Sequence, residues 1–320
     1  FGAGDVPANN GLSIRHTTRN FESREGSKPA AGQLAAVALM DARSIAATAA
    51  NGGRLTPATE AEYTKKVKKY FFDAEIYRKR VYHGAGKAQA DAKLKYGPNI
   101  ADWPEMIPLG KNVLIKAVSV ITDPVTTTDE LIPSGETSSY RSNPMKLAEF
   151  ALSRKEHGYV GRAKAVKADE DARRATGELP ESVLREVEPL HIRTEGTIYG
   201  SCVVAVKPGD GSAREQAASC QRVLGGIANV AEEYATKRYR SNLINWGMLP
   251  FTAKKLHISL GDYIYVEDID KYIAEGAESV PAKLLSGKSV KDITLGLGSL
   301  TPDERSIILK GCLINFNAVH

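Results

Sequence analysis

Three arginines lie close together near the start of the chain, in the segment Ser13-Ile-Arg-His-Thr-Thr-Arg-Asn-Phe-Glu-Ser-Arg24. Gly, Asn and Ser residues are frequent around them, and this composition is typical of a loop. Each guanidinium presents a planar fork that matches the two oxygens of a carboxylate or a phosphate. Arg15, Arg19 and Arg24 therefore predict an anion-binding loop, and the alternative is a set of exposed surface arginines.

A serine stands where a predicted buried strand gives way to a predicted helix, in Gly209-Asp-Gly-Ser-Ala-Arg-Glu215. Ser212 and Glu215 have the spacing of a capping box, so the ordinary interpretation is a helix N-cap. The same position lies at the positive end of the helix dipole, beside free backbone N–H groups and Arg214. Such a field would stabilise a serine alkoxide or a bound carboxylate, which is the functional interpretation.

A third polar segment, Thr126-Thr-Thr-Asp-Glu-Leu-Ile-Pro-Ser-Gly135, is followed by Arg141. Asp129 and Arg141 supply a carboxylate and a guanidinium, and the alternatives are a turn cap and an exposed side chain. No local pattern joins this segment to the other two.

The elements that would hold these segments follow from apolar spacing and turn residues. Residues 32–51 predict an Ala-rich helix, and residues 59–81 predict an exposed helix leading into a linker that ends near Trp103-Pro104. From there the order strand, helix, strand, helix and then strands predicts a compact α/β domain. The predicted strands are 113–121, 198–206, 225–230, 257–266 and 290–297. The predicted helices are 143–155, one that begins at 212, 237–246, and one that opens with a capping box at 301–304 and runs through 312. The charged run 162–188 predicts surface helix and loop, a solvated insertion.

The composition places limits on the class of protein. The chain has 320 residues, a formal charge of +5 and ordinary apolar and charged fractions, which indicates a globular protein with a hydrophobic core. No stretch is apolar enough to span a bilayer, so we expect no membrane association and a cytoplasmic location. The mild basic balance favours small anions over a nucleic-acid groove. The chain opens at Phe1 inside a turn segment, so we expect a processed protein or part of a longer one.

Taken together and in order, these segments resemble motifs of the aconitase family of 4Fe-4S hydro-lyases. Arg19-Asn-Phe-Glu-Ser-Arg24 is similar to the Arg-Asn-Phe-x-x-Arg motif of the family's third domain, and Thr127-Thr-Asp-Glu-Leu-Ile-Pro-Ser-Gly135 to the opening of its mobile fourth domain. Gly209-Asp-Gly-Ser-Ala-Arg-Glu-Gln-Ala-Ala218 is similar to Gly-x-Gly-Ser-Ser-Arg-Glu-His-Ala-Ala. Arg240-Ser-Asn-Leu-Ile-Asn-Trp-Gly-Met-Leu-Pro250 is similar to Arg-x-Asn-Leu-x-x-x-Gly-x-Leu-Pro. Four motifs in the family's order are far more specific than any one of them.

The resemblance implies how the chain is divided and what it does. Residues 1–58 would be the terminal segment of the third α/β domain, residues 59–104 a helical linker, and residues 105–320 a swivelling β/α domain of the aconitase C-terminal type. The activity would be a hydratase that interconverts hydroxy-tricarboxylic or related hydroxy acids by stereospecific dehydration and hydration. Ser212 would be the base that takes the proton from carbon. The arginines that would bind or support the substrate carboxylates are Arg19, Arg24, Arg141 and Arg214.

Some positions depart from the family's pattern. Ala213 stands where a second serine is usual, so only its backbone N–H would remain for the substrate. Asp129 would orient a charged partner on another domain, and Glu130 replaces the usual histidine. Thr18 precedes Arg19 where an asparagine is common. These changes imply a divergent branch of the family.

The cluster cysteines of the family have no counterpart in the chain. Cys202, Cys220 and Cys312 show neither a metal-ligand spacing nor a disulfide pattern, so we expect buried thiols and no cluster bound to this chain alone. The resemblance implies a 4Fe-4S cluster in the complete enzyme, carried by upstream domains or by a separate large subunit. The alternatives are an isopropylmalate-like isomerase, a cluster-free RNA-binding relative, and a structural or regulatory subunit.

Overall fold

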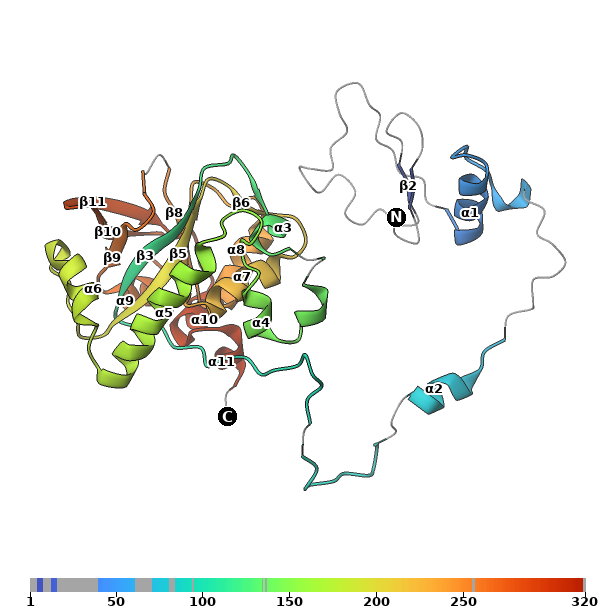
Figure 1. The fold of residues 1–320 in the computed structure, drawn as a ribbon, viewed down its shortest axis with the longest axis horizontal. Helices are drawn as coiled ribbons and strands as arrows, with labels where there is room; N and C mark the ends of the chain where they lie inside the picture. The colour runs from blue at the N-terminus through green and yellow to red at the C-terminus, as the bar shows by residue number, and fades with distance from the viewer. Residues whose placement is uncertain are drawn as a thin grey trace. The chain divides into compact units, whose positions relative to one another are not determined.

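A computed structural model of the chain describes residues 5–7, 13–15, 40–60, 71–80, 84–93, 95–133, 135, 137–254 and 257–318 (Figure 1). The chain divides into two compact units, residues 1–95 and residues 96–320. The predicted three-part division at residues 58 and 104 stays a prediction. The described elements of the first unit are β1 (Asp5–Pro7), β2 (Ser13–Arg15), α1 (Ala42–Ala50), the 3-10 turn η3 (Ala58–Glu60) and α2 (Ala74–Arg80).

Helix α1 confirms residues 42–50 of the predicted helix 32–51, whereas Met40 and Asp41 are described and are not helical. It begins at Ala42 because the Asp41 carboxylate accepts hydrogen bonds from the backbone N–H groups of Arg43 and Ser44. Those bonds, and one from the Ser44 hydroxyl, hold the pKa of Asp41 below its ordinary value. The remainder of that prediction, at residues 32–39, lies outside the described residues.

The second unit is built round a closed barrel of strands. Its strands are β3 (Asn112–Ile121), β5 (Thr197–Ala205), β7 (Gly226–Ala231), β8 (Leu249–Thr252), β9 (Tyr263–Val266), β10 (Ser279–Ser286) and β11 (Ser289–Gly296). They follow each other in the order β10-β11-β8-β7-β5-β3-β9. Strands β3, β5, β7 and β8 pair in parallel, whereas β9, β10 and β11 pair antiparallel. The predicted α/β class is confirmed.

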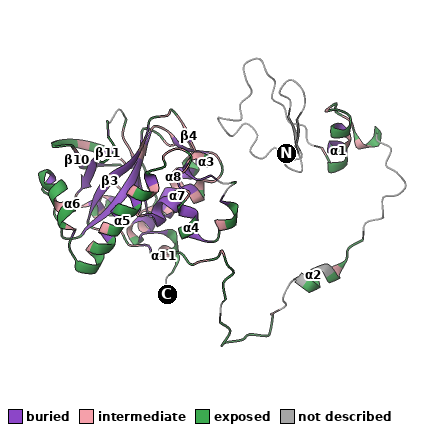
Figure 2. Ribbon diagram, in the orientation of Figure 1, coloured by how far each residue is buried: buried purple, intermediate pink, exposed green. Residues whose placement is uncertain are grey.

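The parallel strands are buried on both faces. Val113 and Ile115 of β3 belong to the core inside the barrel, and Leu114 between them belongs to the core under the helices. This alternation follows from the two-residue period of a strand. It explains why β3 and β5 read as continuous apolar, β-branched runs, and Figure 2 shows β3 buried along its length.

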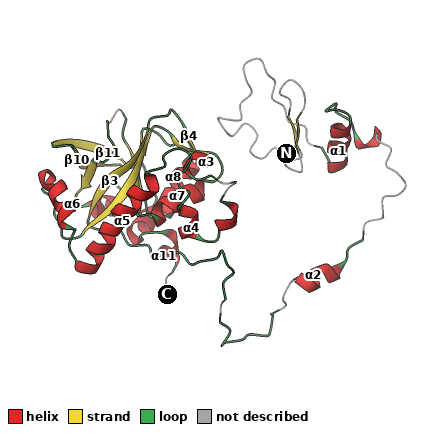
Figure 3. Cartoon of the chain, in the orientation of Figure 1, coloured by secondary structure: helices red, strands yellow, loops and turns green. Residues whose placement is uncertain are grey.

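Helices cover the outer side of the parallel strands (Figure 3). The described helices of this unit are α3 (Thr128–Leu131), α4 (Pro144–Ala148), α5 (Tyr159–Thr176), α6 (Glu181–Glu186), α7 (Arg214–Val223), α8 (Lys237–Asn245), α9 (Ile269–Glu275), α10 (Pro302–Lys310) and α11 (Leu313–Asn317). Among them α5, α7 and α8 contact the parallel strands. The remaining short pieces are the strands β4 (Thr126–Thr127) and β6 (Pro208–Asp210) and the 3-10 turns η4 (Ser138–Tyr140) and η5 (Glu188–Leu190). No helix among the described residues is long and apolar enough to cross a membrane.

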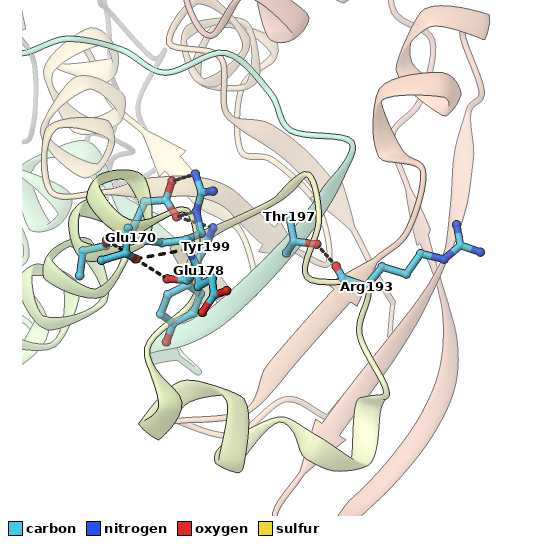
Figure 4. Close-up of polar contacts among 8 residues, drawn as sticks. Glu170, Glu178, Arg193, Thr197 and Tyr199 are labelled. Carbon is cyan, nitrogen blue, oxygen red and sulfur yellow. Dashed lines mark hydrogen bonds and ion pairs between the residues drawn. The ribbon is translucent and has the colours of Figure 1, made fainter.

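Helices α5 and α6 confirm the helix predicted within residues 162–188, but α5 corrects the prediction that this run is a solvated insertion. It packs against β5, and Ala163, Val166 and Glu170 on its inner face are buried. The Glu170 carboxylate accepts hydrogen bonds from the Arg173 guanidinium at 2.6 and 2.8 Å and from the backbone N–H of Tyr199 at 3.0 Å (Figure 4). The charged composition of the segment hid this inner stripe, because its outer face is rich in exposed charges.

Three further predictions need correction at their ends. The helix predicted for 143–155 is α4, which ends at Ala148. The strand predicted for 257–266 begins only at Tyr263, because the Asp262 carboxylate accepts the backbone N–H of Ser259 and closes a turn there. The last helix was predicted to run through Cys312, but α10 stops at Lys310 because Gly311 takes a left-handed conformation. The predicted capping box at its start, between Thr301 and Glu304, is confirmed.

Candidate functional site

Two of the polar segments singled out in the sequence meet beyond the carboxyl ends of β3 and β5. Strand β4 follows β3, β6 follows β5, and the two short strands pair with Thr126 opposite Pro208 and Thr127 opposite Asp210. In open parallel sheets, ligands bind beyond the carboxyl ends of the strands, where the connecting loops leave room. The same reasoning places a candidate site where the segments around Asp129 and Ser212 meet.

The loop from Pro208 to Ala213 has a backbone that only glycine fits at two points. Gly209 has φ +96°, and a Cβ there would lie 2.3 Å from the ring of Tyr239. Gly211 has φ +124°, and a Cβ there would lie 2.3 Å from the Thr128 hydroxyl. The loop is therefore pressed against α8 on one side and against the start of α3 on the other.

Replacing Gly209 with alanine tests this packing. Tyr239 is fully buried, and its hydroxyl accepts hydrogen bonds from the side-chain amides of Gln221 and Asn229, each at 2.9 Å. The ring cannot retreat without breaking those bonds, so we expect Gly209→Ala to lower the free energy of unfolding by about 2–4 kcal/mol.

Gly261→Ala is the matched control, to be measured beside Gly209→Ala by urea denaturation. Gly261 also has a positive φ, +91°, but nothing lies within 4 Å of a Cβ there. It therefore reports the backbone strain alone. Equal losses in the two variants would show that the contact with Tyr239 contributes nothing.

Helix α7 does not begin as the sequence predicted. The predicted capping box of Ser212 and Glu215 is wrong, because the N-cap is Ala213 and no side chain caps the helix there. The backbone N–H of Ala213 instead donates to the Thr128 hydroxyl at 3.3 Å, and the Glu215 carboxylate accepts the indole N–H of Trp246. Ser212 is exposed.

A capping box that the sequence analysis missed lies on the other segment. The Thr127 hydroxyl and backbone N–H exchange hydrogen bonds with Glu130, and these fix the start of α3. Lys155 lies 3.2 Å from the Glu130 carboxylate and 2.8 Å from that of Asp123. The spacing Thr-x-x-Glu is a local signal that could have been found. Glu130, at the position where the resemblance leads us to expect a histidine, therefore fixes the start of α3.

The network around Glu130 predicts a dependence of stability on pH. Partial burial raises the pKa of Glu130, but hydrogen bonds from Thr127 and Lys155 outweigh it, and the net pKa lies below 4.5. A carboxyl group with a lowered folded pKa contributes stability above its ordinary pKa and loses it as the pH falls through the folded value. We expect Glu130→Gln to make the loss of stability between about pH 5 and about pH 2 shallower.

The measurement is urea denaturation across that range of pH. Glu278→Gln, at an exposed position, removes the same charge outside this network and serves as the control. Parallel curves for Glu130→Gln and the unchanged protein would contradict the contribution of Glu130.

The remaining predicted site residues are placed as follows. Asp129 lies in the first turn of α3, and its carboxylate pairs with Arg154 of the same unit at 2.6 Å. Arg141 is exposed at the end of η4, which packs on α4, and α4 packs on α7. Arg214 is the first residue of α7 and is partly buried. Arg19 and Arg24 lie outside the described residues.

The fourth motif holds the fold together. Arg240 of α8 donates to the backbone carbonyls of Leu297 and Ser299, at 2.7 and 3.3 Å. These bonds tie α8 to the segment between β11 and α10. We assign no part of the candidate site to Arg240.

The cysteines do not fit an iron–sulfur cluster. All three are buried and free, and burial raises the pKa of the Cys202 thiol to about 12 and that of Cys220 further. Cluster ligation requires thiolates, which such burial disfavours. Within the described ranges, no group of three or more His, Cys, Asp or Glu side chains is arranged to hold a metal ion.

Comparison with known proteins matches part of the second unit, including the loop from Pro208 to Ala213, to a known domain family. Residues 194–256, which run from the start of β5 to beyond β8, match the family described as the aconitase C-terminal domain. No curated protein matches the chain. A solved structure of 3-isopropylmalate dehydratase from Methanocaldococcus jannaschii is similar, with 22% identity over 63% of this chain and 92% of that one and a TM-score of 0.38. A likeness of that size does not assign a substrate. The domain match confirms the resemblance to the aconitase family for residues 194–256.

Proposed function

We propose that this chain supplies the proton-transfer side of a hydro-lyase site, with Ser212 as the base. The observation that carries the proposal is the pairing of β4 with β6, which joins the Asp129 segment to the Ser212 loop. The Ser212 loop lies within the residues that match the aconitase C-terminal domain. A serine hydroxyl has a very high pKa in water, so its alkoxide needs strong local stabilisation. The amino-terminal end of α7 and the Arg214 guanidinium offer positive charge beside Ser212.

The substrate class follows from what such a site can bind. Arg214 and Arg141 would hold carboxylates through bidentate hydrogen bonds. The base would remove a proton from the carbon next to a carboxylate, and a hydroxyl would leave from the neighbouring carbon. A malate-type skeleton contains both groups, and it is shared by 3-isopropylmalate and by citrate and isocitrate. We propose this skeleton as the substrate and treat both branches as candidates.

The departure of the hydroxyl is not assigned to a residue of this chain. The described cysteines do not fit a cluster, so a 4Fe-4S cluster would come from a cluster-bearing partner, either upstream domains of the same protein or a separate large subunit. In that arrangement this chain binds and orients the substrate and moves one proton. On its own it would not turn over substrate.

The test uses the complete enzyme, with the cluster-bearing part and this chain together. Hydration of the unsaturated intermediates is followed by loss of their conjugated ultraviolet absorbance, with cis-aconitate in one series and isopropylmaleate in the other. Turnover in either series supports the proposal and names the branch. If neither is hydrated and the protein binds RNA with an affinity that falls steeply with salt, the proposal fails in favour of a cluster-free RNA-binding relative.

A further inference from the structure

The two tryptophans of the chain pack against each other, with their rings tilted, beside the helix that carries the candidate site. The ring centroids of Trp103 and Trp246 lie 4.4 Å apart, with an angle of 41° between the rings. Trp246 is buried at the end of α8, and its indole N–H donates to the Glu215 carboxylate at 3.2 Å. Glu215 is the second residue of α7 and follows Arg214 directly.

Glu215 lies where its carboxylate could occupy the amino-terminal end of α7, and the contact with Trp246 prevents this. A carboxylate in the first helical turn is attracted to the positive end of the helix and to its free backbone N–H groups. Those groups are the ones that a substrate carboxylate would use. With the spacing of Ser212 and Glu215, the Glu215 side chain would ordinarily turn back towards the helix end, as in a capping box. It turns towards Trp246 instead.

Trp103, which packs against Trp246, belongs to a segment that is held at both ends by hydrogen bonds. We call residues 101–109 the leading segment, since they lead into β3. The backbone N–H of Ala101 donates to the Ser142 carbonyl at 3.0 Å, and the buried Arg222 guanidinium donates to the Ile107 carbonyl at 2.8 Å. Trp103 lies between these two attachments. It therefore holds the indole of Trp246 in the orientation that directs its N–H at Glu215.

We propose that Trp246 is a positioning residue that holds the Glu215 carboxylate away from the amino-terminal end of α7, so that a substrate carboxylate can bind there. This inference rests on the proposed function. Without the indole N–H, the Glu215 carboxylate would compete for the same backbone donors and repel the substrate's negative charge. The role is electrostatic and acts on substrate binding, and Trp246 itself does not touch the substrate.

The decisive experiment is a double-mutant cycle in the complete enzyme. Trp246→Phe keeps a ring against Trp103 and removes the N–H, and it should raise KM for the hydroxy acid about three- to tenfold while kcat stays within about twofold. Glu215→Gln removes the competing charge and should leave KM unchanged or lower. In the double variant KM should return to within about twofold of the Glu215→Gln value. A KM that stays raised in the double variant would mean that Trp246 acts only through packing, which overturns the inference.

A spectroscopic readout tests the contact independently of activity. The chain has two tryptophans, so its indole N–H region should contain two resonances, and Trp246→Phe identifies one by removing it. Glu215→Ala should shift the Trp246 resonance much more than that of Trp103. An unmoved resonance would overturn the inference whatever the kinetics. If KM is unchanged in Trp246→Phe, this inference fails but the proposed function stands. If the enzyme without any substitution accepts no hydroxy acid, the proposed function fails and this role fails with it.

Discussion

Replacing Ser212 with alanine should lower kcat of the complete enzyme by roughly 10²- to 10⁴-fold, the range expected for loss of a general base. KM should change little, because the arginines proposed to bind the substrate carboxylates remain. Ser212 is exposed and is not the N-cap of α7, so the free energy of unfolding should stay within about 1 kcal/mol of the unchanged protein. The measurements are steady-state kinetics and urea denaturation of the same preparation.

Two comparisons separate a role of Ser212 in proton transfer from a structural role. Ser289→Ala, at the exposed first residue of β11, should leave kcat unchanged and controls for the substitution itself. If Ser212 were only a cap, its removal would cost about 1 kcal/mol of stability and no more than a few-fold in rate. A variant with turnover within a few-fold of the unchanged enzyme would exclude Ser212 as the base.

Replacing Glu170 with alanine should destabilise the second unit by about 3–5 kcal/mol, the cost of removing one partner from a buried ion pair. The Glu170 side chain is 7% exposed and that of Arg173 is 18% exposed, so the guanidinium would remain largely away from water without its partner. The backbone N–H of Tyr199 in β5 would lose its acceptor as well. This contact fixes α5 on the strand whose carboxyl end leads to the Ser212 loop.

The matched control is Glu181→Ala on α6. Glu181 also pairs with an arginine on its own helix, Arg185, but both side chains are about three-quarters exposed, so the pair contributes little. We expect no measurable change in the urea midpoint for this variant. Glu170→Gln, which keeps an acceptor for the Tyr199 N–H and removes the charge, should fall between the two. Equal midpoints for Glu170→Ala and Glu181→Ala would show that burial adds nothing to the pair.

Most of the elements that were predicted correctly have a strong local pattern of apolar or capping residues. The apolar, β-branched runs that became β3, β5 and β7 and the helix that became α8 were predicted nearly to the residue. The capping box at Thr301 was confirmed for the same reason, since a cap depends only on residues three positions apart. Strand β10 was missed, because Pro281 and exposed polar residues interrupt its apolar pattern.

Two of the failures involve partners that are distant in the sequence. Helix α5 looked solvated because nothing local shows that Glu170 would find the backbone of β5, which lies 29 residues further along the chain. Ser212 looked like a cap because the pattern cannot show that Glu215 finds Trp246 instead.

The sequence by itself determined which groups are available for chemistry: a serine and an arginine after one strand, and an aspartate and an arginine after another. It also determined their order, and that order indicated the aconitase family. Only the tertiary structure decided that β4 and β6 pair and press Gly211 against Thr128. The physical reason is that short-range propensities fix strands and caps, whereas strand pairing and the direction of a charged side chain depend on partners that meet only when the chain is folded.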